Sequence, residues 1–248
     1  MDQDVISLKN GLSTLGIDAD DVKIQNLCRF YEMLVEKNKV MNLTAITEWE
    51  DVVNKHFIDS ASLACVKTDN EAIVYRMLSE GSTVCDLGTG AGFPGIPLAI
   101  LFYESHFVLM DALRKRIDFL RDVVNELDLR NVELIHGRAE DLARDRSHRE
   151  QYDICVSRAV SALNVLSEYC LPFVKVGGVF LSYKGEKAET ELADATRAIK
   201  TLGGGNATIH SFRLPQSDLP RVIINIPKAS ATPKTYPRKA GTPERKPL

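Results

Sequence analysis

Residues 83–95, which read TVCDLGTGAGFPG, join the end of an apolar strand to a glycine-rich turn and the start of a helix. The first five residues are typical of a buried strand, and alternating glycines follow at Gly88, Gly90 and Gly92. Glycine allows a sharp turn and a close approach of the backbone to a ligand. A helix that opens near Pro94 offers unpaired N–H groups in its first turn. Strand, turn and helix together predict a nucleotide-binding pocket.

A dinucleotide is one possible ligand of this turn, because Gly90, Gly92 and Gly95 match the G-x-G-x-x-G fingerprint. Two residues argue against a pyrophosphate. Asp86 places a carboxylate at the strand end, where it would repel a diphosphate. Pro94 removes one backbone N–H from the helix start, where a phosphate would use it.

S-adenosylmethionine fits the turn better, because it carries no phosphate and its amino and sulfonium groups suit an acidic loop. The D-x-G-x-G-x-G order that begins at Asp86 resembles motif I of the class I methyltransferases, which use this cofactor. We therefore expect Asp86, Gly88 and Gly90 to contact S-adenosylmethionine.

The composition is that of an ordinary globular protein. The 248 residues suit one large domain or a core with a smaller cap, with 44% hydrophobic and 26% charged residues. The five cysteines form no C-x-x-C pair, which argues against a zinc site or a disulfide framework and predicts a reducing compartment. The first residues are acidic, unlike a signal peptide, and no apolar run is long enough to span a membrane. We expect a cytoplasmic protein with no metal site and no membrane contact.

Basic residues are concentrated at the C-terminal end. The net charge is −3, yet residues 228–248 carry +5 and the preceding chain −8. This segment also holds four of the ten prolines, which predicts an extended, irregular tail. Arg238 and Lys239 in the tail are expected to contact RNA phosphates. A tail that folds back on the acidic body is the alternative.

The first 66 residues have the pattern of helices and show no strand pattern. Leu27, Phe30 and Leu34 recur at helical spacing. Thr47 and Glu50 have the spacing of a capping box, which predicts the start of a helix that carries residues 49–57 toward residues 59–60. We expect residues 1–66 to form a helical cap on the core.

Residues 67–227 alternate between strand and helix patterns, which predicts an α/β fold with a doubly wound parallel sheet. The last two strands have no helix between them, so they should be antiparallel. This seven-stranded, Rossmann-like arrangement is that of the class I methyltransferases. The expected strands are 83–87, 106–111, 132–136, 152–157, 178–183, 207–214 and 221–227.

Polar residues follow the expected strands where ligands bind in such sheets. Asp111 ends the second strand, where its carboxylate can accept hydrogen bonds from both ribose hydroxyls; capping the next helix is the alternative. Ala139 and Glu140 follow the third strand and are expected to frame the adenine. The acidic pair at Glu140 and Asp141 is also compatible with a helix start that favours negative charge.

Basic residues end the fourth and fifth strands, at Arg158 and Lys184. A charged residue just past an apolar run points into the cleft, although a surface salt bridge is the alternative for Arg158. We assign Arg158 to the junction of cofactor and target, and Lys184 to the substrate.

The fourth strand end lacks the Asn/Asp-Pro-Pro-aromatic motif of enzymes that methylate exocyclic amines, since residues 157–160 read SRAV. No cysteine lies in a motif of the pyrimidine C5 enzymes. A lone-pair target such as guanine N-7 needs neither a base nor a covalent step, so positioning and electrostatics would supply catalysis. His56 is the other candidate acid or base, and a structural role is its alternative.

The sequence resembles the GidB (RsmG) family of bacterial small-subunit rRNA guanine-N7 methyltransferases. The motifs that carry the resemblance span the chain from Asn38 to its end. They are residues 38–44 (NKVMNLT), 56–60 (HFIDS), 86–99 (DLGTGAGFPGIPLA), 157–159 (SRA), 183–185 (YKG) and 236–243 (YPRKAGTP).

The resemblance implies methyl transfer from S-adenosylmethionine to N-7 of a guanine in 16S rRNA. The substrate would be naked RNA or a small-subunit particle, and we expect the enzyme to be a monomer. It implies cofactor contacts at Gly88, Phe93, Ala139, Glu140 and Arg158. The basic pair that the family carries after its second strand corresponds to Arg114 and Lys115, which are expected to bind RNA.

Three other functions remain compatible with the sequence. A methyltransferase with a different RNA or protein target would share the same pocket. An oxidoreductase would bind a nicotinamide or flavin at the glycine turn. A ribosome assembly factor would bind the particle without turnover.

Overall fold

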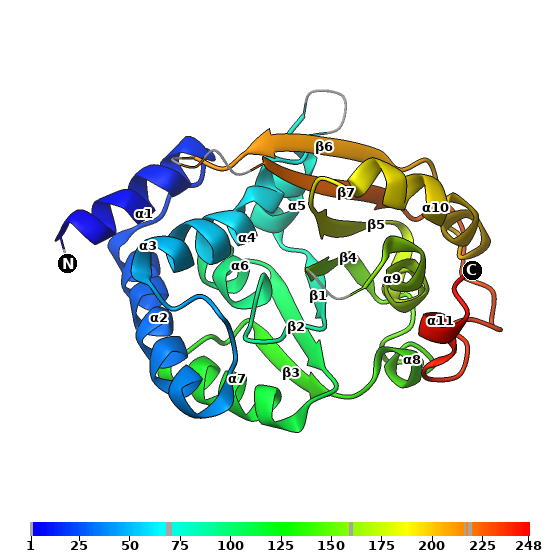
Figure 1. Cartoon of the computed structure of the whole chain (residues 1–248), viewed down its shortest axis with the longest axis horizontal. Coiled ribbons are helices and arrows are strands. Elements are labelled where there is room, and N and C mark those ends of the chain that lie inside the picture. Colours follow the sequence, from blue (N-terminus) through cyan, green and yellow to red (C-terminus); the bar gives the residue numbers. More distant parts are fainter. Residues whose placement is uncertain (1, 68–70, 159–160, 216, 218–219) are drawn as a thin grey trace.

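A computed structural model describes residues 2–67, 71–158, 161–215, 217 and 220–248 of the chain. Helices form the first part, which lies along one side of a central sheet (Figure 1). They are α1 (Asp2–Thr14), α2 (Asp21–Met41), α3 (Trp49–Val52), a π-helix (Val53–Ile58), α4 (Asp59–Ala61) and a 3-10 helix (Ser62–Cys65).

Local signals explain the ends of α2. The Asp20 side chain accepts a hydrogen bond from the Lys23 backbone N–H and so caps the helix start. Asn42 ends the helix at φ 48, in the left-handed region that asparagine tolerates. The capping box expected at Thr47 is wrong, because α3 begins after Glu48 without a side-chain cap.

The seven strands form one sheet in the order β3-β2-β1-β4-β5-β7-β6. β1 to β5 are parallel, whereas β7 is antiparallel to both β5 and β6, which confirms the expected fold class. The strands are β1 (Thr83–Leu87), β2 (His106–Asp111), β3 (Val132–His136), β4 (Tyr152–Arg158), β5 (Val174–Lys184), β6 (Thr208–Arg213) and β7 (Pro220–Pro227).

Helices cover both faces of the sheet. Val84 points to a cluster with α2, α6 and α7, and the next residue, Cys85, points to a cluster with α9 and α10. This alternation follows from the two-residue period of a strand. The remaining helices are α5 (Ile73–Glu80), α6 (Gly95–Leu101), α7 (Arg114–Glu126), α8 (Ala139–Leu142), α9 (Leu163–Cys170), a 3-10 helix (Leu171–Phe173), α10 (Ala188–Thr201) and α11 (Thr242–Arg245).

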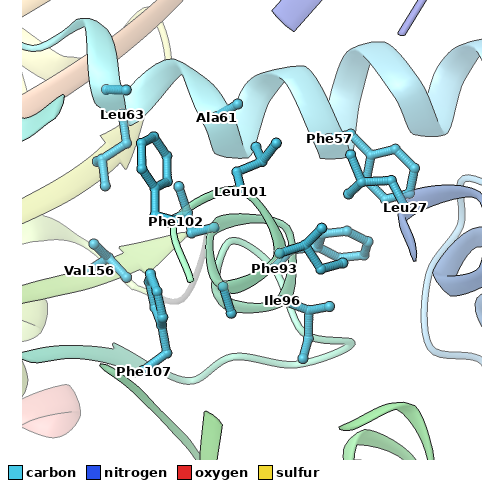
Figure 2. Close-up of a cluster of buried hydrophobic side chains, with 14 of the residues drawn as sticks. Leu27, Phe57, Ala61, Leu63, Phe93, Ile96, Leu101, Phe102, Phe107 and Val156 are labelled. Carbon is cyan, nitrogen blue, oxygen red and sulfur yellow. The ribbon is translucent and has the colours of Figure 1, made fainter. Parts of the chain in front are cut away.

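The helices before β1 are joined to the core by an aromatic and aliphatic cluster. Figure 2 shows Leu27 and Phe57 from these helices beside Phe93 and Ile96 of the glycine-turn region. The Phe30 and Phe93 rings lie 5.3 Å apart, centroid to centroid. Burying such rings contributes on the order of 2 kcal/mol for each side chain. The cap and the glycine turn therefore share one hydrophobic core.

The C-terminal segment packs on the body near α8 and α9, as Figure 1 shows in red. Lys228 is fully buried, and its ammonium donates to the Leu171 carbonyl and the Thr232 hydroxyl and pairs with Glu150. The basic tail is therefore folded back, which is the alternative that the sequence left open. Within the described residues, no helix is both long enough and apolar enough to cross a bilayer.

Candidate active site

The glycine turn lies at the carboxyl end of β1, in the middle of the sheet. Gly88, Gly90 and Gly92 all have positive φ, at 71°, 62° and 100°. A Cβ on Gly90 would meet only the Gly88 carbonyl oxygen, at 3.9 Å, so this position faces open space. A Cβ on Gly92 would instead lie 2.7 Å from the Ile96 side chain. Gly90 thus keeps a cavity open, and Gly92 allows close packing of α6.

Two adjoining cavities follow the strand ends. The first, of about 480 Å³, lies against the cap and is lined by residues that include Thr44, His56, Gly90, Phe93, Asp111 and Arg158. The second, of about 170 Å³, lies against the tail and is lined by residues that include Asp111, Ala139, Glu140, Tyr169, Gly241 and Glu244. Gly88 and Asp111 line both cavities. The expected residues Gly88, Gly90, Phe93, Asp111, Ala139, Glu140 and Arg158 are therefore brought together in one elongated cleft.

Asp86 lies beneath the glycine turn, not in the cleft, which corrects the expectation of a direct cofactor contact. Its side chain is buried, and Oδ2 accepts a hydrogen bond of 2.9 Å from the Gly95 N–H at the start of α6. Burial raises the pKa of Asp86 to about 7, although the Thr89 hydroxyl, the Gly95 N–H and the Arg158 charge lower it. Asp86 therefore positions the turn and the helix start.

Asp111 caps the next helix, which is the alternative that the sequence offered for it. Its Oδ1 accepts from the Leu113 N–H at the start of α7, at 2.8 Å. Its Oδ2 accepts from the Gly90 N–H at 3.0 Å and from the Arg116 guanidinium at 3.1 Å. The carboxylate thus holds the glycine turn in place, and the residue lines both cavities. Arg116, whose role the sequence did not reveal, neutralises this buried charge.

Glu140 connects the second cavity to the tail. Ala139 and Glu140 form the first turn of α8, and both line this cavity. The Glu140 carboxylate accepts a hydrogen bond of 2.9 Å from the Gly241 N–H. The expected adenine-binding segment is therefore also a contact site for the C-terminal residues.

Arg158 joins the core to the cap. Its guanidinium pairs with Asp59 at 3.0 Å and donates to the Lys55 carbonyl at 3.1 Å. It also lies over the Phe93 ring, with 5.1 Å between the guanidinium carbon and the ring centroid. Asp59 accepts a second hydrogen bond, of 2.7 Å, from Arg221 on β7. Arg158 is held by several partners at the edge of the first cavity, so a surface salt bridge does not describe it.

His56 stacks on Phe93, with 4.4 Å between ring centroids, and lines the first cavity. Its Nδ1 lies 3.1 Å from an Arg158 nitrogen, and its Nε2 lies 3.0 Å from the Thr44 hydroxyl oxygen. Nδ1 also lies 3.0 Å from the Lys55 carbonyl oxygen, which can only accept, whereas the guanidinium can only donate, so the two contacts at Nδ1 require opposite tautomers of the ring. Burial, together with the Arg158 charge, lowers the pKa of His56 to about 4. His56 is therefore a neutral ring at physiological pH.

Lys184 does not face the cleft, which corrects its assignment to the substrate. Its ammonium donates to the Ser161 carbonyl at 2.7 Å and pairs with Glu191 of α10, also at 2.7 Å. The side chain is 8% exposed. Lys184 thus connects β5, α10 and the chain after β4.

The residues assigned to RNA divide into two groups. Arg114 and Lys115 are exposed at the start of α7, and Lys239 is exposed in the tail. Arg238 instead forms an ion pair with the buried Glu168, with 2.6 Å between Nη2 and Oε2. Arg238 is therefore a structural anchor in this conformation.

Several residues of the cleft were not identified from sequence pattern. Asp59 and Thr44 lie within motifs quoted for the family resemblance, but their pairing with Arg158 and His56 depends on tertiary structure. Arg221, which reaches Asp59 from β7, and Tyr169, which lines the second cavity, fall outside those motifs. No local signal marks them.

The side chains that line the cleft suit a nucleoside attached to an amino acid better than they suit a metal ion. Among the described residues, no cluster of three or more His, Cys, Asp or Glu side chains could hold a metal ion. The open space beside Gly90 and the carboxylates of Asp111 and Glu140 provide a cradle with hydrogen-bond acceptors. These residues fit S-adenosylmethionine, which offers ribose hydroxyls and an adenine amino group.

Comparisons with known proteins agree with this geometry. A family model, GidB, described as rRNA small subunit methyltransferase G, matches residues 23–219. Proteins named ribosomal RNA small subunit methyltransferase G are similar over nearly the full length. The protein from Alkaliphilus metalliredigens is 47% identical over 97% of each chain, and the protein from Alkaliphilus oremlandii is 48% identical over 97% of each chain.

Solved structures support the fold. An O-methyltransferase from Bacillus cereus, solved in complex with SAH, matches with a TM-score of 0.55 and 16% identity. The match covers 87% of this chain and 94% of that chain. At this identity the likeness concerns the fold alone.

Proposed function

The chain belongs to the GidB family of rRNA small subunit methyltransferase G proteins, and from this premise we propose that it methylates N-7 of a guanine in 16S rRNA. It is a methyltransferase, and its cofactor is S-adenosylmethionine. One observation supports the site most directly: the cleft at the strand ends joins the glycine turn to Arg158 and His56 of the cap interface. The methyl donor and the target base would therefore meet in the first cavity.

The second cavity is proposed to hold the adenosine part of the cofactor. Ala139 and Glu140 lie there, and the Asp111 carboxylate between the cavities supplies acceptors for ribose hydroxyls. Gly90 leaves space for the methionine part. S-adenosylmethionine supplies the methyl group as an electrophile when bound.

Arg158 is proposed to position the target guanine. Asp59 and the Lys55 carbonyl fix its guanidinium, and the Phe93 ring supports it from one side. An arginine can donate to the O-6 edge of guanine, as in groove recognition. N-7 carries a free lone pair at neutral pH, so no proton has to leave before transfer. The residues of the cavity then act by orientation and electrostatics.

His56 is proposed to orient Arg158 without acting as a base. Its Nδ1 lies 3.1 Å from an Arg158 nitrogen, and its lowered pKa keeps the ring neutral. The Thr44 hydroxyl oxygen lies 3.0 Å from Nε2 and holds the other side of the ring. Each of these groups keeps the guanidinium in one orientation.

The substrate is ribosomal RNA, and we propose that a cytoplasmic monomer recognises it within 16S rRNA or a small-subunit particle. Arg114, Lys115 and Lys239 are exposed cations that support contact with phosphates. We further propose three functional units: a helical cap (1–66), a methyltransferase core (67–227) and a tail (228–248). The cap supplies His56 and Asp59 to the cavity edge, which supports a role in catalysis for this unit.

Nucleoside mass spectrometry of 16S rRNA from cells with and without the gene tests this function. We expect one 7-methylguanosine to disappear in the deletion and to return with the wild-type gene. Complementation with Arg158→Ala should restore little of it. A deletion strain whose 16S rRNA keeps every methylated guanosine would contradict the proposal.

A further inference from the structure

The C-terminal segment contributes to the wall of the second cavity. Gly241 and Glu244 line it together with Ala139, Glu140 and Tyr169. Figure 1 shows α11 next to α8 and α9, although these helices are far apart in sequence. The tail therefore lies at the same end of the cleft as the residues expected to frame the adenine.

A buried ion pair between Arg238 and Glu168 forms a latch that holds this segment on the body. Glu168 is fully buried on α9, and its carboxylate accepts from the Arg238 guanidinium and from the Arg238 backbone N–H. A buried carboxylate without its partner is strongly unfavourable, so this pair holds the segment firmly. Arg144 and Arg149 add hydrogen bonds to the Pro237 and Tyr236 carbonyls.

A second contact joins the segment directly to the cavity. Gly241, at φ 76, donates its N–H to the Glu140 carboxylate at 2.9 Å. Glu140 is thus both a cavity residue and an acceptor for the tail. Any displacement of the latch would move Gly241 and Glu244 and would release one oxygen of Glu140.

We propose that residues 237–245 close the adenine end of the cofactor site, and that the Arg238–Glu168 pair holds them there. The inference rests on the proposed S-adenosylmethionine site. The ligand that fits is a purine nucleoside with an amino donor, because Glu140 and Glu244 supply acceptors at this cavity. Arg238 is accordingly a positioning residue for the cofactor, acting through the segment.

The Arg238→Ala variant tests this inference by calorimetry with S-adenosylhomocysteine and with 5′-methylthioadenosine. We expect the affinity for both ligands to fall at least tenfold and by similar factors, because both carry the adenosine part. Arg238→Lys should recover part of the loss. In steady-state kinetics, the KM for S-adenosylmethionine should rise while the KM for RNA changes less than twofold.

Lys234→Ala is the matched control, because Lys234 is an exposed cation of the same tail outside the latch. Its affinity for both ligands should stay within twofold of wild type. The inference is overturned if folded Arg238→Ala binds both ligands as tightly as wild type does, or if Lys234→Ala shows the same loss. Failure of the wild type itself to bind S-adenosylhomocysteine would instead contradict the proposed function.

Hydrogen exchange on the wild-type protein decides the question even if Arg238→Ala does not fold. Saturating S-adenosylhomocysteine should slow amide exchange in residues 238–245 by tenfold or more. Unchanged exchange in this segment, with slower exchange at the glycine turn, would contradict closure of the site by the tail.

Discussion

Gly90 shows how a single residue keeps the cleft open. Its φ of 62° lies in the left-handed region, and a Cβ there would project into the first cavity without meeting a side chain. The position therefore requires glycine for two reasons, the backbone conformation and the space that a ligand needs.

The Gly90→Val variant should bind S-adenosylmethionine more than tenfold more weakly, a loss of about 1.4 kcal/mol or more, as calorimetry would measure. The strained φ should also cost roughly 1–2 kcal/mol of stability. Gly16→Val is the matched control, because Gly16 has φ 75° and no neighbour within 4 Å of an added Cβ. It should show the stability loss with unchanged affinity; equal affinity in both variants would contradict the site.

The sequence predicted well which residues gather at the cleft. It predicted less well which partner each of these side chains contacts. The strand-end positions of Asp111 and Arg158 followed from the alternating pattern. Asp86 was expected in the cleft because it lies at the end of β1, just before the glycine turn, yet its carboxylate accepts from the Gly95 N–H. Lys184 at the end of β5 was misplaced for a similar reason, since its partner Glu191 lies on α10. Partner choice depends on tertiary contacts that spacing does not encode.

The π-helix Val53–Ile58 is the element that brings the cap into the site. It carries His56 and the Lys55 carbonyl, and both contact Arg158. π-helical turns occur often at functional sites. The helix was expected from the sequence, but its π form was not, because no residue pattern specifies the wider turn.

The start of α7 is the element best placed to meet RNA. Arg114 and Lys115 are exposed there, next to Leu113, which lines the first cavity. Replacing both by alanine should make the slope of log K for RNA binding against log salt concentration shallower by about 1–2, because two phosphate contacts are lost. Filter binding to 16S rRNA across a salt series measures this slope.

Arg197→Ala/Lys200→Ala on α10 is the control for that slope, since it removes the same two charges from another exposed helix. Its slope should match wild type, and cofactor affinity should be unchanged in both double variants. Equal slopes for the two double variants would place RNA binding elsewhere on the molecule.

The C-terminal tail illustrates the limit of charge as a predictor. Its +5 charge suggested an extended arm for RNA. Lys228 and Arg238 are instead paired with Glu150 and Glu168 of the acidic body. The composition could not distinguish these outcomes, because the acidic partners come from segments remote in sequence.

Across the whole molecule, the order of strands and helices was the most predictable feature. Seven strands alternate with helices or form the last antiparallel pair, and this order determines the sheet topology and the position of the cleft. The cleft is completed by segments outside the sheet, namely the cap at the first cavity and the tail at the second. Their docking rests on side-chain packing, such as Phe30 against Phe93.

We propose that the assembled cleft transfers a methyl group by positioning, with no enzyme base. His56 is the titratable imidazole at the first cavity, and its pKa of about 4 leaves it neutral above pH 6. Lowering the pH from 9 to 6 therefore does not protonate it, so its contact with Arg158 persists throughout this range.

The most direct measurement is the single-turnover rate of methyl transfer to guanine N-7 from about pH 6 to 9, a range that brackets ordinary histidine titration. We expect no rising limb from His56 in wild type, and rates that are lower at every pH in Arg158→Ala and His56→Ala. A rate that rises with an apparent pKa near 6.5 in wild type, and loses that rise in His56→Ala, would contradict it.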